Sequence, residues 1–281
     1  MPEEKLSIIQ AIELAIAHEL EARKSYMALA EETDDPELRS LLKEIAQEEA
    51  GHETTLRSRL KLYQEKHLLR DTISRYVSPE VCEEVLRNPG LLQLGGQRRR
   101  VTVLFADLRG FTALSERLKP EEVVEALNIF FTAMVDLVFE HQGTLDKFLG
   151  DAMMAVFGVP VMIPEAPVKA VECALAMQGA LRQMQAQKAT VIQGMGIGIN
   201  TGEAIVGNIG SARRMDFTVI GDVVNIAARL QELTKELDVD ILVGESTHQE
   251  VADRFRMAPE HQVVLRGRKE PTRAFRVLGP G

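Results

Sequence analysis

Apolar residues near the start of the chain recur every three or four positions, the spacing of a helix with one buried face. Apart from Pro36 and Gly51, the ranges 5–33 and 36–66 contain neither proline nor glycine. The pattern predicts two long helices joined at TDDPE, with Asp35 as the N-cap of the second helix and Pro36 at its first position. A two-helix hairpin has a small core, so we expect it to pack against a partner, most simply a second copy of itself.

From Val101 onward, short apolar runs alternate with longer periodic segments, which is typical of strands that alternate with helices. This order predicts an α/β sandwich. The segment 68–98 reads as a connector, with a short helix at SPEVCEEVL and breaks at NPG and GG. The expected strands are 101–106, a hairpin over 144–157, 192–201, a pair at AIVGNIG and MDFTVIG, and 239–243, and the expected helices are 120–141, 164–187 and 222–236.

The composition is that of a soluble globular protein, with 45% hydrophobic and 27% charged residues in 281. No run approaches the roughly 18 apolar residues that span a membrane, and the polar start MPEEKLSIIQ is unlike a secretory signal. Cys82 and Cys173 lack metal-site spacing, so we expect a cytoplasmic protein without a disulfide framework. The net charge of −9 argues against non-specific binding to nucleic acid.

The acidic charge is concentrated toward the N-terminus. Residues 1–67 contain nine Lys and Arg residues and fifteen Asp and Glu residues, whereas the remainder contains 24 and 27. The change supports a boundary near His67. Together with the connector, it leads us to expect three parts: a helical hairpin over 1–67, a helical connector over 68–98 and a second domain over 99–281.

Two acidic residues lie where expected strands end. Asp107 closes the apolar strand and precedes LRGFT, and Asp151 lies in the turn of KFLGDAMMAVF. Gly110 and Gly150 let the backbone approach a ligand, and the amides of the helix after LRGFT could face an anion. Two carboxylates beside an amide-rich turn suit Mg²⁺ and phosphate groups. The alternative is that Asp107 caps a turn and Asp151 occupies a hairpin, without a metal.

The second part of the chain contains four motifs in this order: VLFADLRGFTALSE, DKFLGDAMMAVFG, INTGEAIVGNIG and MDFTVIGDVVNIAARL. Class III nucleotide cyclase catalytic domains have similar motifs in the same order, and residues 76–278 resemble such a domain. The resemblance implies an α+β fold with a ferredoxin-like βαββαβ core. It implies an adenylate cyclase that converts ATP to 3′,5′-cyclic AMP and pyrophosphate, in which Asp107, Asp151 and the Leu108 carbonyl hold two Mg²⁺ or Mn²⁺ ions. A diguanylate-cyclase palm shares the core but is disfavoured, since no GGDEF-like stretch is present.

The resemblance also assigns residues to the nucleotide base. Lys147 and Thr218 match the base-reading positions. Lysine only donates hydrogen bonds and suits adenine N1, while a threonine hydroxyl can accept from the adenine 6-amino group. The pair therefore favours ATP over GTP. Phe111 and Thr112 belong to the turn whose amides would face the substrate phosphates.

Further residues are implied for the ribose and the phosphates: Asn225 orients the ribose, Arg229 stabilises the transferring phosphate, and Arg266, with Arg268 as its rival, contacts the terminal phosphates. Without the resemblance, Asn225 and Arg229, four apart, would read as a solvated helix face. In this family the metal-binding acids and the base-reading residues come from different subunits. The resemblance therefore implies a homodimer with two equivalent sites.

Charged residues interrupt the apolar stripes of the helical hairpin. Glu19 on the first helix and Glu49 and His52 on the second fall in the predicted seam, where an unpaired carboxylate is costly. Glu-x-x-His on one helix with a glutamate on a neighbouring helix is the arrangement of di-iron carboxylate bundles. The stretches ELEARKSYMALAEE and IAQEEAGHETTL resemble rubrerythrin-type ferritin-like proteins.

Proteins of that type have four helices, so the resemblance implies that two chains pair their hairpins into a ferritin-like four-helix bundle with a di-iron site. Iron redox state, oxygen or peroxide would then regulate the cyclase through the connector. Two alternatives stay open. One is a plain dimeric bundle whose polar residues pair with one another, and the other is a catalytically silent cyclase-like module for binding or iron storage.

Overall fold

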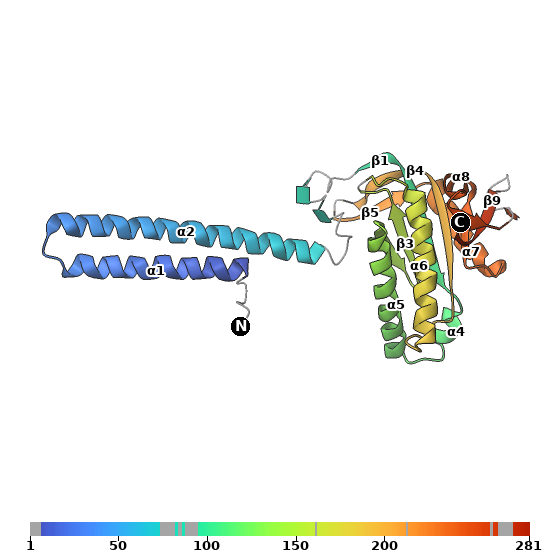
Figure 1. Cartoon of the computed structure of the whole chain (residues 1–281), viewed down its shortest axis with the longest axis horizontal. Coiled ribbons are helices and arrows are strands. Elements are labelled where there is room, and N and C mark those ends of the chain that lie inside the picture. Colours follow the sequence, from blue (N-terminus) through green and yellow to red (C-terminus); the bar gives the residue numbers. More distant parts are fainter. Residues whose placement is uncertain are drawn as a thin grey trace. The chain divides into compact units, whose positions relative to one another are not determined.

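The computed structural model describes residues 7–73, 82–83, 86–87, 95–160, 162–211, 213–258, 261–263 and 272–281. The chain divides between Ile73 and Ser74 into two compact units (Figure 1), a helical hairpin and a larger mixed unit. Within the described residues, no helix combines the length and the apolar character needed to cross a membrane.

The hairpin consists of α1 (Ile8–Glu32) and α2 (Pro36–Ile73), which lie antiparallel. The predicted N-cap is confirmed, because Asp35 Oδ1 accepts hydrogen bonds from the backbone amides of Glu37 at 2.9 Å and Leu38 at 3.4 Å. The second helix is longer than predicted and continues through the first residues assigned to the connector. Much of SPEVCEEVL lies outside the described residues.

The hairpin buries very little. Its described residues include only three fully buried hydrophobic side chains, Ile16, Ala30 and Ala46. Several large apolar side chains stay about half exposed instead, namely Leu14, Leu29 and Leu41. This agrees with the expectation that two helices cannot close a core on their own.

The larger unit is built on one mixed sheet with the strand order β2-β3-β1-β4-β6-β9-β7, with β5 paired to β4 and β8 to β9. The strands are β1 (Gly95–Leu108), β2 (Thr144–Leu149), β3 (Ala152–Phe157), β4 (Met195–Ser211), β5 (Arg214–Ile220), β6 (Ile241–Gly244), β7 (Phe255–Met257), β8 (His261–Val263) and β9 (Thr272–Pro280). The helices are α4 (Phe111–Ser115), α5 (Pro120–Glu140), α6 (Ala166–Ala186), α7 (Asp222–Glu236) and α8 (Glu245–Val251).

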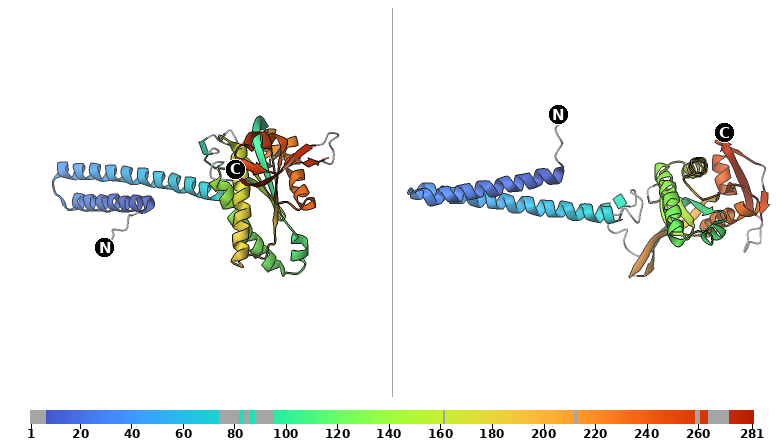
Figure 2. Two further views of the ribbon diagram at one scale, coloured as in Figure 1. Left: turned by 45° about the vertical axis from the view of Figure 1, so that its right-hand side comes forward. Right: turned by 90° about the horizontal axis from the view of Figure 1, so that it is seen from below.

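The predicted ferredoxin-like core is confirmed by the chain order β1-α5-β2-β3-α6-β4 and the antiparallel pairs β2–β3, β3–β1 and β1–β4. Helices α5 and α6 cover one face (Figures 1 and 2), and α7 covers the other. In β1, Leu104 and Ala106 pack toward α5 and α6, whereas Val103 and Phe105 pack with the α7 residues. Burial on both faces explains the uninterrupted apolar run.

The structure differs from the predicted strands in one place that matters for the site. The predicted strand 192–201 and the segment AIVGNIG form a single strand, β4, whose far end pairs with β5 in an antiparallel arm. The sequence suggested two strands because glycines interrupt the run. In an antiparallel strand pair, however, a glycine allows close backbone approach without ending the strand. The arm carries Thr218 opposite Gly207.

Candidate functional site

Two carboxylates meet at the end of the central strands. Asp107 lies near the end of β1 opposite Ala152, the first residue of β3, so it faces the turn that holds Asp151. Gly150 makes this turn with a φ of 69°, a left-handed conformation that glycine adopts without strain. Burial raises the pKa of Asp107, and the nearby charge of Asp151 raises it further, while a hydrogen bond from Gln231 opposes the rise.

The backbone beside Asp107 forms a short turn. Leu108 is buried and ends β1, and Gly110 has a φ of 68° before α4 begins. Phe111 is half-buried against the core, and Thr112 is exposed at the start of this short helix. The turn thus brings Leu108, Phe111 and Thr112 to the same end of the sheet as Asp107.

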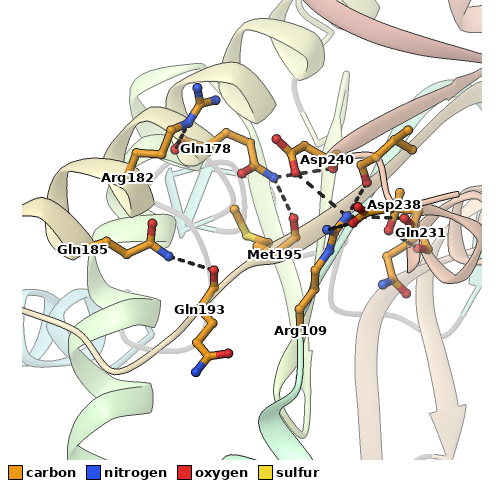
Figure 3. Close-up of polar contacts among 11 residues, drawn as sticks. Arg109, Gln178, Arg182, Gln185, Gln193, Met195, Gln231, Asp238 and Asp240 are labelled. Carbon is orange, nitrogen blue, oxygen red and sulfur yellow. Dashed lines mark hydrogen bonds and ion pairs between the residues drawn. The ribbon is translucent and has the colours of Figure 1, made fainter. Parts of the chain in front are cut away.

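Arg109 fixes the position of that turn. Its guanidinium donates to the carbonyl oxygens of Thr234, at 3.3 Å, and Val239, and pairs with Asp238 at 3.1 Å (Figure 3). Its partners lie at the end of α7 and just beyond it. Arg109 therefore ties the acid-bearing turn to the helix that covers the sheet.

Gln231 of α7 contacts the acid pair directly, because its amide donates to Asp107 Oδ2 at 3.4 Å. Sequence reasoning missed Gln231 and Arg109. Their partners lie more than 120 residues away along the chain, and nothing in the local pattern indicates such a contact.

A second cluster joins β2 to the arm. Lys147 Nζ donates to Thr218 Oγ1 at 3.2 Å, and Thr218 Oγ1 donates to Asp146 Oδ2 at 2.7 Å. Lys147 Nζ also lies 3.2 Å from Asp146 Oδ1. The Lys147 side chain is 35% exposed and the Asp146 side chain 3% exposed, so the lysine lies at the surface end of the cluster. The structure thus brings together the two residues assigned to the base and adds Asp146, which sequence reasoning missed.

Asn225 and Arg229 lie on α7 and share a face, as their spacing predicts. Asn225 is exposed, and Arg229 pairs with Glu232 at 2.7 Å. At about 100° per residue, Arg229 lies roughly 200° around the helix from Gln231. Since Gln231 is the residue that touches Asp107, Arg229 and Asn225 point away from the acid pair of their own chain.

Arg266 and Arg268, the residues assigned to the terminal phosphates, lie outside the described residues.

In the hairpin, Glu19, Glu49 and His52 each place a ligand atom within 4.8 Å of the others. His52 Nδ1 lies 3.3 Å from Glu49 Oε2 and 3.9 Å from Glu19 Oε2. The hydrogen bond between the two carboxyl groups raises the pKa of Glu19 and lowers that of Glu49. The glutamates are half-buried, but the His52 side chain is 65% exposed, because a single hairpin offers nothing to cover it.

Comparisons with known proteins match two parts of the chain to two different families. The family model for the adenylate and guanylate cyclase catalytic domain matches residues 96–278, and the rubrerythrin family model matches residues 10–87. An uncharacterised protein of Mycobacterium tuberculosis is 36% identical over 218 residues, which is 76% of this chain. This chain spans only 39% of that relative's length.

Solved cyclase structures are similar to the larger unit. The guanylyl cyclase Cya2 is 40% identical, with a TM-score of 0.62 over 67% of this chain and 96% of its own. The adenylyl cyclase CyaB from P. aeruginosa is 34% identical, with a TM-score of 0.61 over 66% of this chain and 96% of its own. Because both adenylyl and guanylyl cyclases are similar to this chain, these comparisons do not distinguish ATP from GTP.

Proposed function

Because this chain belongs to the family of adenylate and guanylate cyclase catalytic domains, we propose that it is an adenylate cyclase acting as a homodimer and regulated by its rubrerythrin-like hairpin. The reaction converts ATP to 3′,5′-cyclic AMP and pyrophosphate. The contact between Lys147 and Thr218 carries the choice of ATP. These residues are 71 positions apart, yet they present an ammonium group and a hydroxyl oxygen side by side.

The donor pattern of this pair suits adenine. The ammonium group of Lys147 can only donate and meets the unprotonated N1 of adenine, whereas guanine carries a hydrogen on N1. The Thr218 oxygen can accept from the 6-amino group, which guanine replaces with a carbonyl oxygen. Lys147 keeps exposed surface for such a contact. A mismatched base would leave donors or acceptors unpaired, which is how such sites reject close analogues.

Asp107 and Asp151 fit a divalent cation. Their oxygens are hard ligands, and the pKa of Asp107 is raised first by burial and then by the charge of Asp151, both of which a bound cation would offset. Bound Mg²⁺ or Mn²⁺ ions would make the ribose 3′-hydroxyl more acidic and neutralise phosphate charge. The protein's part is to hold both carboxylates at one edge, through the β1–β3 register, and to place the amides of the following turn beside them.

The face of α7 supports a site shared between two chains. Asn225 and Arg229, the ribose and phosphate residues, point away from the acid pair of their own chain. A second chain related by twofold symmetry can supply them, and the exchange is reciprocal. We therefore place Asp107, Leu108, Asp151, Phe111 and Thr112 in one half of each site.

The other half of each site then holds the base-reading pair Lys147 and Thr218 together with Asn225, Arg229 and Arg266.

The hairpin fits iron in the same sense. Glu19, Glu49 and His52 offer two carboxylates and an imidazole at ligand spacing, which is half of the set that di-iron bundles use. A second hairpin would supply the other half and cover the exposed imidazole. Bound iron would add a redox change that alters the bundle, and the segment after α2 would transmit it. Equal cyclase rates for the iron-free, ferrous and ferric protein would exclude this regulation.

The primary test is an assay of the purified full chain with Mn²⁺ and either ATP or GTP. We expect cyclic AMP from ATP, with a kcat/KM at least about tenfold above that for GTP. A preference for GTP would exclude adenylate cyclase. No product from either nucleotide, in a protein that is folded and dimeric, would favour the silent binding module.

A further inference from the structure

Asp146 is a buried acid to which neither the sequence motifs nor the proposed chemistry assign a role. Its side chain is 3% exposed and lies between Lys147 and Thr218. Its Oδ2 accepts from Thr218 at 2.7 Å. Its Oδ1 lies 3.2 Å from Lys147 Nζ, yet among the described residues this buried oxygen has no well-oriented hydrogen bond. Burying a carboxylate in this way is costly, so its position calls for a reason.

A β-bulge explains how two adjacent residues reach the same partner. Leu145 pairs with Ala155 and Lys147 with Met154, so Asp146 is an extra residue in β2 without a partner in β3. Neighbouring residues of a regular strand point to opposite faces, but a bulge re-aims one of them. Asp146 and Lys147 can therefore both contact Thr218.

The hydrogen atoms of the cluster can be counted. Thr218 donates its one hydroxyl hydrogen to Asp146 Oδ2, and the Lys147 ammonium group, 3.2 Å from Oδ1, favours a carboxylate that can only accept. Lys147 has only hydrogens to offer and so occupies one lone pair of Thr218. Burial raises the pKa of Asp146, whereas the hydrogen bond from Thr218 and the charge of Lys147 oppose that rise and favour the ionised form. Thr218 then has only its second lone pair free, so its hydroxyl can only accept a hydrogen bond from a ligand.

We propose that Asp146 is a positioning residue that fixes the Thr218 hydroxyl as an acceptor and thereby selects a 6-aminopurine nucleotide over a 6-oxopurine nucleotide. The proposal rests on the proposed adenylate cyclase function. It explains how a hydroxyl, which can normally turn to donate or accept, distinguishes a base with a donor at position 6 from a base with an acceptor there.

The substitution Asp146→Asn gives a sharp test, because Lys147 attracts the amide oxygen and so turns the amide NH₂ toward Thr218. The NH₂ then donates to Thr218 and frees the hydroxyl hydrogen to face the ligand. We expect the ratio of kcat/KM for ATP to that for GTP to fall at least about tenfold in the full chain. Asp146→Ala should lower the ratio less, because it lets the Thr218 hydroxyl turn freely but does not force it to donate to the ligand.

Purine riboside 5′-triphosphate, which lacks only the 6-amino group, isolates the contact. The wild-type chain should prefer ATP over this analogue by about tenfold or more, and Asp146→Asn should lose that preference. Thr218→Val should also lose the preference for ATP over the analogue. Adding Asp146→Asn to Thr218→Val should change this preference no further, because both substitutions act through the Thr218 hydroxyl. Asp253→Asn, which removes an exposed acid, is the matched control and should keep the wild-type ratios.

The outcomes separate this proposal from the function on which it rests. A wild-type preference for GTP overturns the adenylate cyclase assignment. A wild-type preference for ATP that persists unchanged in folded, dimeric Asp146→Asn overturns the role of Asp146 alone. If Asp146→Asn does not fold, the wild-type chain and Thr218→Val still decide, because equal use of ATP and purine riboside triphosphate by the wild type excludes the contact.

Discussion

The hairpin and the catalytic unit each gather carboxylates, but they support them in different ways. Asp107 and Asp151 lie at the end of strands whose sheet is covered on both faces. Gln231 of α7 donates to Asp107, and Arg109, in the turn after β1, binds the carbonyl oxygen of Thr234 on α7. The Glu19, Glu49 and His52 cluster is held only by helical spacing and by contact between two helices that bury three hydrophobic side chains among the described residues.

The difference indicates what each unit lacks when it is a single chain. The catalytic unit has a complete core, but it would contribute only half of each proposed site, because Arg229 points away from the acid pair of its own chain. Among its described residues, the hairpin closes no core and offers only half of the proposed iron ligands. In the proposed homodimer, a second copy of the chain would supply what is missing in both units, and it would also stabilise the hairpin by completing its core.

The largest effect is expected from breaking the shared site. Asp107→Asn and Arg229→Ala should each lower cyclase activity by at least about 100-fold, because each removes charge stabilisation at the reacting phosphate. An equal mixture of the two, refolded together, should regain about a quarter of wild-type activity, because half of the dimers then hold one intact site. Cyclic AMP production measures both results.

A mixture of Asp107→Asn with Asp151→Asn is the matched control for this prediction. Both substitutions damage the same half of the site, so no combination of these chains contains an intact site, and the mixture should stay inactive. Recovery in this control, or none in the first mixture, would contradict a site shared between chains.

The second effect is loss of iron from the hairpin. Glu49→Ala should remove most of the iron from the full chain reconstituted with ferrous ions, because it deletes a carboxylate at the centre of the cluster. Its neighbour Glu48 is exposed, so Glu48→Ala should keep the wild-type iron content. Metal analysis gives the comparison, and equal iron content in both variants would show that iron, if bound, is held elsewhere.

The sequence predicted the parts of both units that depend on local pattern. The helix spacing, the Asp35 cap, the apolar strand before Asp107 and the turn at Asp151 all follow from residues close together in the chain. It did not predict contacts that depend on folding. Arg109 and Gln231 gain their roles only when α7 is placed on the sheet, and Asp146 gains its role from a bulge that breaks the alternation on which strand reasoning relies.

The third prediction compares the packing of the two units through glycine. A methyl group at Gly198 of β4 would clash with the backbone of Gln231 and Ala227 on α7. Gly198→Ala should therefore destabilise the catalytic unit by about 1–3 kcal/mol and move Gln231 away from Asp107. A methyl group at Gly51, inside α2, would meet no atom within 4 Å apart from the adjoining backbone of its own helix, so Gly51→Ala should stabilise the hairpin by about 0.5–1 kcal/mol. Urea unfolding measures both, and a loss of stability in Gly51→Ala would mean that a second chain covers this position.

The smallest effect concerns the cost of the acid pair itself. The folded-state pKa of Asp107 is raised, first by burial and then by the charge of Asp151. The folded protein therefore binds this proton more tightly than the unfolded chain, and the stability of the metal-free protein falls as pH rises through the folded pKa. Asp107→Asn should raise the melting temperature of the metal-free protein at neutral pH, and the gain should shrink as pH falls below that pKa.

Mg²⁺ should stabilise the wild type more than the variant at neutral pH, since only the wild type keeps the Asp107 carboxylate that a bound cation would neutralise. Melting curves with and without Mg²⁺ across this pH range measure the effect, and a gain that grows on acidification would show that Asp107 is stabilising in its charged form.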